Sequence, residues 1–232
     1  MHRAFHRLQT CAWPIGVLVV LTCFGLYLRI ANISSEQVWI DEAFHLFQAD
    51  AIHRHGIPLL ASGVADFKDA FFAYIITLLT YLPFDNEISF RMLSVIAGAL
   101  AIACVYPLTR LLGASPWIAL LPSAFLAVSS THIAWSRQIK PYSLLVLLII
   151  LFSTLLVLYT RTQKIRYAFF ALLFLVLATM TKTIAALLIL PFGVALFLYS
   201  PKYARKWLVL ATILPVGIFA WWAVGQFQFF SF

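Results

Sequence analysis

The sequence predicts an all-α integral membrane protein, a single transmembrane domain of about seven helices. The 232-residue chain is 63% hydrophobic and only 10% charged, which is far more apolar than a soluble domain. Its first uncharged run, Cys11 to Leu28, has the length of a membrane span. Its charges separate hydrophobic segments instead of forming a continuous polar surface. Each segment can therefore be assigned in order as a helix or a loop.

Residues 1–11 are predicted to be a cytoplasmic tail, because Arg3 and Arg7 precede the first span. A cleaved signal peptide is disfavoured, since the apolar run is long and has no clear small-residue cleavage site. The net charge of +8 does not indicate nucleic-acid binding, because no basic stretch is interleaved with the aromatics of a binding platform. We therefore interpret the positions of the basic residues as a consequence of the membrane topology.

Residues 34–90 contain all eight acidic residues and are predicted to form one extracytoplasmic loop. Within it, Glu42 to Arg54 is predicted to be a helix that lies on the membrane surface and ends at Gly56. The apolar residues on one face of this helix are Phe44, Phe47 and Ala51.

Ala70 to Phe84 is ambiguous, because fifteen uncharged residues are fewer than the ~20 that a straight span needs. The positive-inside rule decides its assignment. If the segment does not span, all the clustered basic residues are cytoplasmic: Arg3, Arg7, Arg110, Arg161, Lys164, Arg166, Lys202, Arg205 and Lys206. If the segment spans, fewer basic residues are cytoplasmic: Arg3, Arg7, Arg91, Arg137, Lys140 and Lys182. We therefore expect Ala70 to Phe84 to be interfacial or re-entrant, a second juxtamembrane element.

The rest of the domain, residues 91–232, holds the remaining helices. They are predicted at Met92–Thr109, Trp117–Trp135, Pro141–Thr160, Tyr167–Met180, Thr183–Ser200 and Trp207–Phe227. A turn at Leu111 to Pro116 joins the first two of these as a hairpin. Tyr167 to Ser200 is short for two full spans, so Lys182 at their junction is expected to be recessed and to line a cavity.

This topology brings most of the chemically capable residues to the outer side. They are Asp41, Glu42, Lys68, Asp69, Glu87, Arg91, His132, Arg137, Lys140, Tyr142 and Lys182. The centres of the helices are nearly free of charge, which disfavours a transporter with ionisable residues at the membrane midplane.

Four segments resemble a known family. They are VWIDEAFH (Val38 to His45), the segment from Ile88 to Ser115, SRQIKPYSLL (Ser136 to Leu145) and TKTIAALLILP (Thr181 to Pro191). In order and spacing they resemble the GT-C membrane glycosyltransferases, in the branch of protein O-mannosyltransferases and bacterial aminoarabinose-transferase-like enzymes. The resemblance implies a GT-C-like bundle with juxtamembrane helices in the first outer loop. It also implies transfer of a sugar from a polyprenyl-phosphate donor to a protein or lipid acceptor outside the cytoplasm.

The resemblance assigns the acidic pair to catalysis. Asp41 matches the acid proposed as the general base, which takes the proton of the acceptor hydroxyl as it attacks the anomeric carbon. Glu42 would position the acceptor or the loop. From the residues alone, the N-cap of the surface helix is the favoured role of Asp41; the resemblance favours catalysis, and both roles are compatible.

Positively charged side chains are needed to stabilise the polyprenyl phosphate that leaves in this reaction. Arg91 matches the family arginine at the start of the next helix, and a guanidinium binds phosphate bidentately. The further candidates are Lys68, Arg137, Lys140 and Lys182. Lys68 lacks the prolines that follow the basic residue of relatives, and Arg137 and Lys140 could instead be interfacial side chains with their charge in the headgroups.

No metal or other cofactor is predicted. Some relatives carry a second acid in the loop after the third helix, but residues 129–142 contain no Asp or Glu. His45, His53 and His55 are interpreted as interfacial residues, since no carboxylate or thiol set accompanies them.

The relatives generally continue for several more spans. We therefore expect a fragment, a minimal catalytic module, or a subunit that needs a partner. The alternative to an enzyme is a non-catalytic subunit or scaffold that binds polyprenyl phosphate without turnover. The expected location is the plasma or inner membrane, with several passes and the N-terminus in the cytoplasm.

Overall fold

The computed structural model describes residues 2–35, 37–60, 62–81 and 86–200, and these ranges are helical throughout apart from connecting loops and one isolated bridge between Leu59 and Ala65. The elements are α1 (His2–Ile30), η1 (Ile33–Ser35), α2 (Ile40–His55), α3 (Ala70–Leu79), α4 (Asn86–Leu111), α5 (Leu120–Val128), α6 (Ser130–Ser136), α7 (Tyr142–Thr162), α8 (Ile165–Thr181), η2 (Thr183–Leu188) and α9 (Ile189–Tyr199). The all-α prediction is confirmed.

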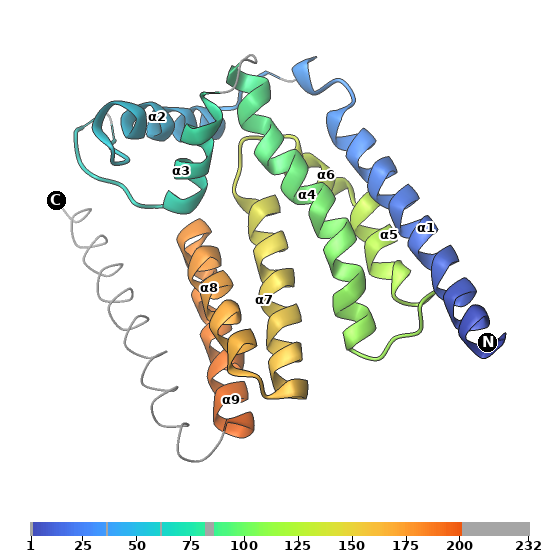
Figure 1. The fold of residues 1–232 in the computed structure, drawn as a ribbon. Coiled ribbons are helices and arrows are strands. Elements are labelled where there is room, and N and C mark those ends of the chain that lie inside the picture. Colours follow the sequence, from blue (N-terminus) through green and yellow to red (C-terminus); the bar gives the residue numbers. More distant parts are fainter. Residues whose placement is uncertain (1, 36, 61, 82–85, 201–232) are drawn as a thin grey trace.

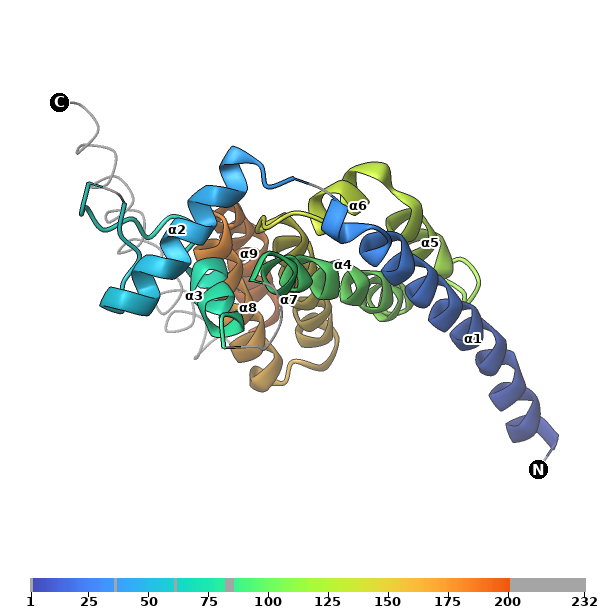
Figure 2. The same ribbon diagram turned by 90° about the horizontal axis from the view of Figure 1, so that it is seen from above.

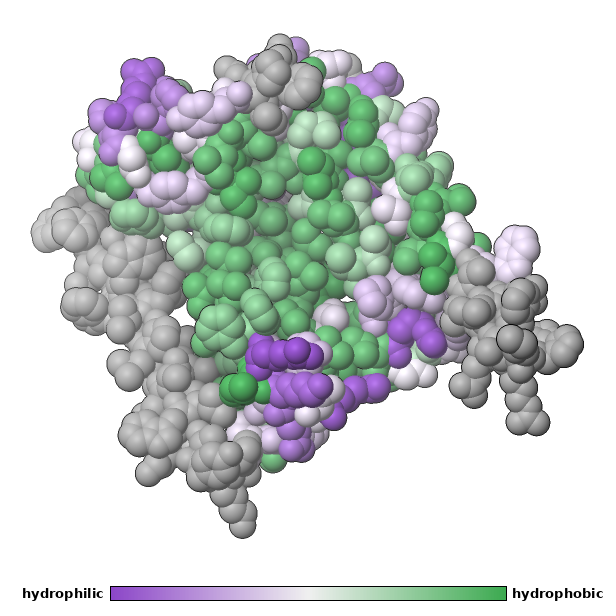
Figure 3. All heavy atoms as spheres, viewed as in Figure 1, coloured by the Kyte–Doolittle hydropathy of each residue, from purple (hydrophilic) through white to green (hydrophobic). Residues whose placement is uncertain are grey.

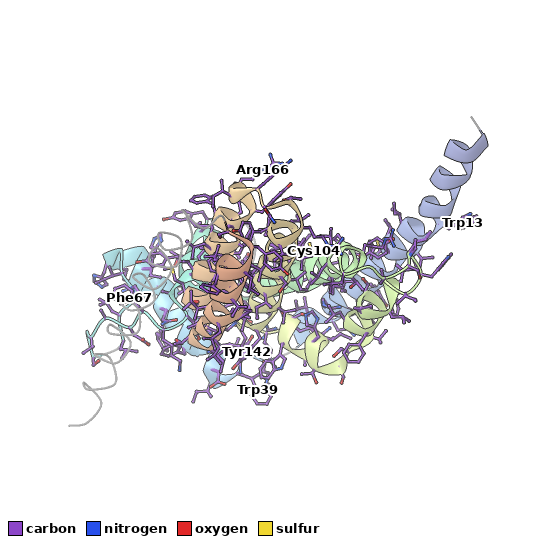
Figure 4. The ribbon with its side chains drawn as sticks, turned by 90° about the horizontal axis from the view of Figure 1, so that it is seen from below. Trp13, Trp39, Phe67, Cys104, Tyr142 and Arg166 are labelled. Carbon is purple, nitrogen blue, oxygen red and sulfur yellow. The ribbon has the colours of Figure 1, made fainter. Side chains whose placement is uncertain are left out.

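The long helices form a bundle that α2 and α3 cover at one end (Figure 1). Helices α4 and α7 lie in its centre, with α1, α5 and α6 on one flank and α8 and α9 on the other (Figures 1 and 2). The first half of α1 extends away from the bundle (Figure 4), and Trp13 there is 75% exposed.

Three helices in the described ranges are long and apolar enough to cross a membrane, through Trp13–Ile30, Glu87–Leu111 and Tyr142–Thr162. Helix α8 and the η2–α9 segment are apolar but shorter. The predicted count of seven spans is therefore not confirmed, and the seventh, Trp207–Phe227, lies outside the described residues. The visible face of the bundle carries a broad apolar belt with polar groups at its two ends (Figure 3), as expected of a protein surrounded by lipid.

The predicted third span is wrong as a single helix. It is divided into α5 and α6 at Ser129, whose backbone is extended with φ −61° and ψ 115°. The Ser129 hydroxyl caps the new helix by accepting the N–H of His132 at 3.4 Å. The predicted hairpin before α5 is present, and Gly113 supplies its left-handed residue at φ 101°.

The helix predicted at Thr183–Ser200 also differs, because its first six residues form the 3₁₀ segment η2. The C-terminal end of α8 contacts α3. It lies deeper in the bundle than the N-terminal end of α4 at the same side (Figure 1). The chain is extended at Lys182, with φ −157° and ψ 122°, before it turns back. Lys182 thus lies beneath α3, in agreement with the expected recessed position.

Helix α2 ends at Gly56, as predicted, with φ 77°. Helix α3 has ten residues and is about 15 Å long, half of what a span requires, so it does not cross a membrane on its own. Its residues Phe72 and Ile76 are fully buried against the bundle.

The face by which α2 packs was not foreseen. Its buried side chains include Glu42, His45 and Gln48, whereas Phe47 is 69% exposed. Phe47 therefore points away from the bundle, and the face that packs on the bundle carries these polar side chains together with Ala49 and Ile52. This is favourable because each of these polar groups has hydrogen-bond partners in the interior.

Candidate active site

Glu42 links three parts of the chain beneath α2. Its carboxylate is fully buried and accepts the N–H of Trp39 at 2.9 Å and the N–H of Ile139 at 2.7 Å. Arg91 of α4 donates to both oxygens, at 3.4 and 3.3 Å. Helix α2 begins at Ile40, so the acid that bonds to the capping residue Trp39 is Glu42. The alternative of Asp41 as N-cap is therefore wrong.

Arg91 is 1% exposed, and Glu42 is not its only partner. The guanidinium also donates to the carbonyls of Ile33 at 2.8 Å and Gln37 at 3.3 Å. A phosphate could reach this group only if these contacts opened. In this arrangement Arg91 fixes the segment between α1 and α2.

Asp41 is the exposed member of the acidic pair, with 69% of its side chain accessible. Its Oδ2 atom lies 2.8 Å from the Lys140 ammonium, which also lies over the ring of Trp135 at 4.8 Å. The hydrogen bond and the charge of Lys140 lower the pKa of the Asp41 carboxyl below its usual range. Asp41 is therefore ionised at neutral pH, and its surface remains open to a ligand.

A second ion pair lies beside the first. Lys182 donates to Asp69 at 2.8 Å, and its ammonium lies 5.4 Å from the centre of the Tyr142 ring. The Tyr142 and Trp135 rings are 4.6 Å apart, so two aromatic rings connect Lys182 to Lys140. Both lysines can therefore act on one bound anion while resting on aromatic surfaces.

Asp69 has an unusual backbone for a residue with a side chain, with φ 56° and ψ 27° in the left-handed region. It is only 6% exposed and begins α3. Such a conformation is uncommon and has a small energetic cost, which the buried contact with Lys182 offsets.

Two of the predicted phosphate ligands lie apart from these ion pairs. Arg137 donates to the carbonyls of Leu28, Ala31 and Asn32 and so caps the C-terminal end of α1. Lys68 is exposed, and its charge contributes to the lowered pKa of Asp41, which places its ammonium near the acidic pair.

Arg29 is a structural residue that the sequence analysis missed. It is fully buried and donates to the Leu126 carbonyl at 3.0 Å, His132 Nδ1 at 2.7 Å and Ser136 Oγ at 3.2 Å. These acceptors belong to α5 and α6, so Arg29 stabilises the break between them. The signal available in the sequence was an arginine in the last turn of α1, directly after the uncharged run from Cys11 to Leu28. Helix α6 leads directly to residues 137–140, which contact Glu42 and Asp41.

Of the three histidines considered as metal ligands, His53 and His55 are exposed, but His45 is buried, so its interpretation as an interfacial residue is wrong. Within the described ranges, no three His, Cys, Asp or Glu side chains are grouped closely enough to hold a metal ion.

The fold of the helical bundle has a counterpart among solved structures. The chain superimposes on the crystal structure of an Archaeoglobus fulgidus oligosaccharyltransferase, tethered through a disulfide bond to an acceptor peptide containing the NVT sequon. The TM-score is 0.62 at 14% sequence identity, over 94% of this chain and 35% of that one. The fold is therefore of the GT-C class, and the chain spans about a third of that relative's length.

The sequence also matches a family model. Residues 70–224 match the model of the dolichyl-phosphate-mannose-protein mannosyltransferases, and the chain belongs to this family. The matched region includes Arg91, Arg137, Lys140 and Lys182, while Asp41 precedes it. No curated protein matches the chain.

Proposed function

We propose that the chain is a glycosyltransferase that moves a sugar from a polyprenyl-phosphate donor to a hydroxyl group of a protein or lipid acceptor on the extracytoplasmic face. The observation that carries the proposal is the exposed Asp41 carboxylate, held at 2.8 Å from Lys140 beside a second lysine pair. A base for the acceptor and cations for the leaving group are what this reaction needs. Family membership supports the reaction class.

Asp41 acts as the general base in this proposal. The acceptor oxygen forms its bond to the anomeric carbon, the bond from that carbon to the phosphate oxygen breaks with its electron pair, and the acceptor proton passes to Asp41. The products are the glycosylated acceptor and polyprenyl phosphate. One displacement of this kind inverts the anomeric centre.

The donor phosphate is bound by Lys140 and Lys182, with Lys68 nearby. In the structure Lys140 is paired with Asp41 and Lys182 with Asp69. A phosphate that attracts Lys140 weakens its contact with Asp41, which makes the carboxylate a stronger base when the donor is bound. Glu42 and Arg91 position the loop that carries Asp41, and Arg137 holds the end of α1.

A transfer assay tests the proposal. Purified protein in lipid nanodiscs is given radiolabelled polyprenyl-phosphate sugars and a pool of protein and lipid acceptors. Label is expected to move to an acceptor and polyprenyl phosphate to accumulate. Donor binding without transfer to any acceptor would instead support a non-catalytic carrier or scaffold.

Lys140→Met is expected to move the acid limb of the pH–rate profile to higher pH. The Lys140 contact lowers the pKa of Asp41, so its removal returns that pKa toward the usual value of about 3.9. Asp41 is then protonated, and inactive as a base, at pH values where the wild type still works. The measurement is kcat/KM from pH 3 to 8, whose acid limb reports the free protein, in which Lys140 contacts Asp41.

Arg54→Met is the matched control for this shift. Arg54 forms an exposed ion pair of 2.9 Å with Asp50 on the same helix. Its removal should leave the acid limb unchanged. An unshifted limb in Lys140→Met would contradict the assigned role of Asp41.

The proposed orientation predicts opposite labelling of the two ends of the bundle. His55 lies at the end of α2, and Lys164 lies in the turn between α7 and α8 at the far end (Figure 1). In a variant without native cysteines, His55→Cys should react with an impermeant maleimide from outside the cell. Lys164→Cys should react only after the membrane is opened, and the reverse pattern would invert the topology.

A further inference from the structure

His45 is a buried side chain to which the proposed reaction gives no role. It follows Asp41 by one helical turn, so both lie on the same side of α2. The residue is 5% exposed, with its ring 5.2 Å from that of Phe72 and 5.6 Å from that of Phe44. Packing between two aromatic rings fixes the position of the imidazole.

The hydrogen bonds of Gln48 determine which nitrogen of His45 carries the proton. The Gln48 Nε2 atom faces the backbone carbonyls of Lys68 at 3.0 Å and Asp66 at 3.4 Å, and both can only accept. This fixes the NH₂ end of the amide, so Oε1 is the end that faces His45 Nδ1 at 3.2 Å. An amide oxygen can only accept, and therefore Nδ1 carries the proton and Nε2 of the neutral ring keeps its lone pair.

The charged groups around His45 come from several elements. Asp69, Lys182 and Lys140 act on its charge, and its charge in turn acts on Asp41 together with that of Lys68. Burial lowers the pKa of His45, and the two lysines add to this effect against the opposing influence of Asp69 and Gln48. The ring is therefore neutral at physiological pH.

Nε2 remains available to a ligand. Within the described ranges no residue forms a hydrogen bond to it. In these ranges the polar side-chain atoms that are both inaccessible to solvent and without a partner are Ser89 Oγ, Ser123 Oγ and His132 Nε2, so Nε2 of His45 is accessible. The charges of Asp69, Lys182 and Lys140 act on His45, and Asp41 lies one helical turn before it on α2. In the proposed reaction the base lies at the acceptor and the lysines at the phosphate, and the sugar ring lies between them.

We propose that Nε2 of His45 accepts a hydrogen bond from one hydroxyl group of the donor sugar and thereby selects which sugar is bound. The inference rests on the proposed function, because it needs a polyprenyl-phosphate sugar in this site. A neutral acceptor with a fixed tautomer recognises a hydroxyl without attracting the phosphate. A site built to bond to a hydroxyl discriminates against an analogue that lacks it, because the buried acceptor is then left unpaired.

The tautomer can be measured without any substrate. In protein labelled with ¹⁵N-histidine, the resonances of His45 are assigned by their loss in His45→Gln. The Nδ1 signal should be that of a protonated nitrogen and the Nε2 signal that of a bare one. Gln48→Met should produce a mixture of tautomers. A proton on Nε2 in the wild type would overturn the proposal.

Recognition of the hydroxyl is tested by donor binding, which does not require turnover. Dissociation constants are measured for polyprenyl-phosphate mannose and its 2-, 3-, 4- and 6-deoxy analogues. Wild-type protein should bind one analogue roughly 10-fold to 100-fold more weakly than the parent sugar, the loss expected for an unpaired buried acceptor. His45→Phe keeps the ring packing and should bind the parent and that analogue equally.

His45→Gln, which offers an amide oxygen, should restore part of the discrimination. An equal loss for every analogue in His45→Phe, or unchanged discrimination, would sink the assignment. These outcomes are separate from failure of the proposed function, in which donor binds to the wild type but transfer is absent or is unaffected by loss of Asp41. Absence of donor binding to the wild type would overturn both.

Discussion

Asp41→Asn is expected to abolish sugar transfer while the protein still folds and binds its donor. Asparagine keeps the shape of the side chain but cannot take a proton, so the contribution of general base catalysis, roughly 10²-fold to 10⁴-fold, is lost. Folding should be preserved because the side chain is largely exposed and Glu42, not Asp41, bonds to the cap of α2. The measurements are the transfer rate, the dissociation constant of the donor and the melting temperature in detergent.

A matched substitution separates this effect from a general loss of charge on α2. Asp50 lies on the same helix, is 53% exposed and forms an ion pair of 2.9 Å with Arg54. Asp50→Asn removes a comparable charge and a comparable pair. It should leave transfer unchanged, whereas full activity in Asp41→Asn would refute Asp41 as the base.

The sequence was sufficient for features that depend on local chemistry or on length. The end of α2 at Gly56 follows from the backbone freedom of glycine. Residues Ala70 to Phe84 were few for a straight span, and the positive-inside rule favoured an interfacial segment, in which the structure forms the ten-residue helix α3. The placement of acids and lysines at one end of the bundle follows from the distribution of charge along the chain.

The break at Ser129 was not predictable in the same way. The segment from Trp117 to Trp135 contains no glycine and no Asp, Glu, Lys or Arg, which is typical of one continuous span. Its division depends on Arg29, which is about a hundred residues earlier in the sequence and bonds to the carbonyl of Leu126. A contact between distant residues leaves no periodic pattern in either segment.

The sequence also did not show which acidic residue pairs with each basic residue. A single sequence shows that Glu42 and Arg91 could both reach the outer end of the bundle, but it does not show that they bond to each other. Lys140 and Lys182 are paired with different acids, each from a separate part of the loop. Which cation faces a ligand and which supports the scaffold is decided by burial, and burial depends on the whole fold.

Arg91→Met is expected to be the most destabilising single substitution at this end of the bundle. The Glu42 and Arg91 side chains are 0% and 2% exposed, and loss of the arginine leaves a buried carboxylate without its cation. The cost of breaking such a pair is about 3–5 kcal/mol in the free energy of unfolding. The measurement is the unfolding of the purified variant in detergent, compared with the wild type.

The double variant Glu42→Gln/Arg91→Met separates support of the scaffold from binding of phosphate. Glutamine keeps one acceptor oxygen, which can accept the N–H of Ile139 or of Trp39 but not both, and no buried charge remains, so part of the lost stability should return. If Arg91 acts only by holding Glu42, donor affinity should return together with stability. If the guanidinium binds the phosphate directly, the double variant will be more stable than Arg91→Met but will bind the donor as weakly as Arg91→Met. Because the two quantities respond differently, this pair of measurements determines whether the buried arginine contacts the donor or only shapes the site in which Asp41 works.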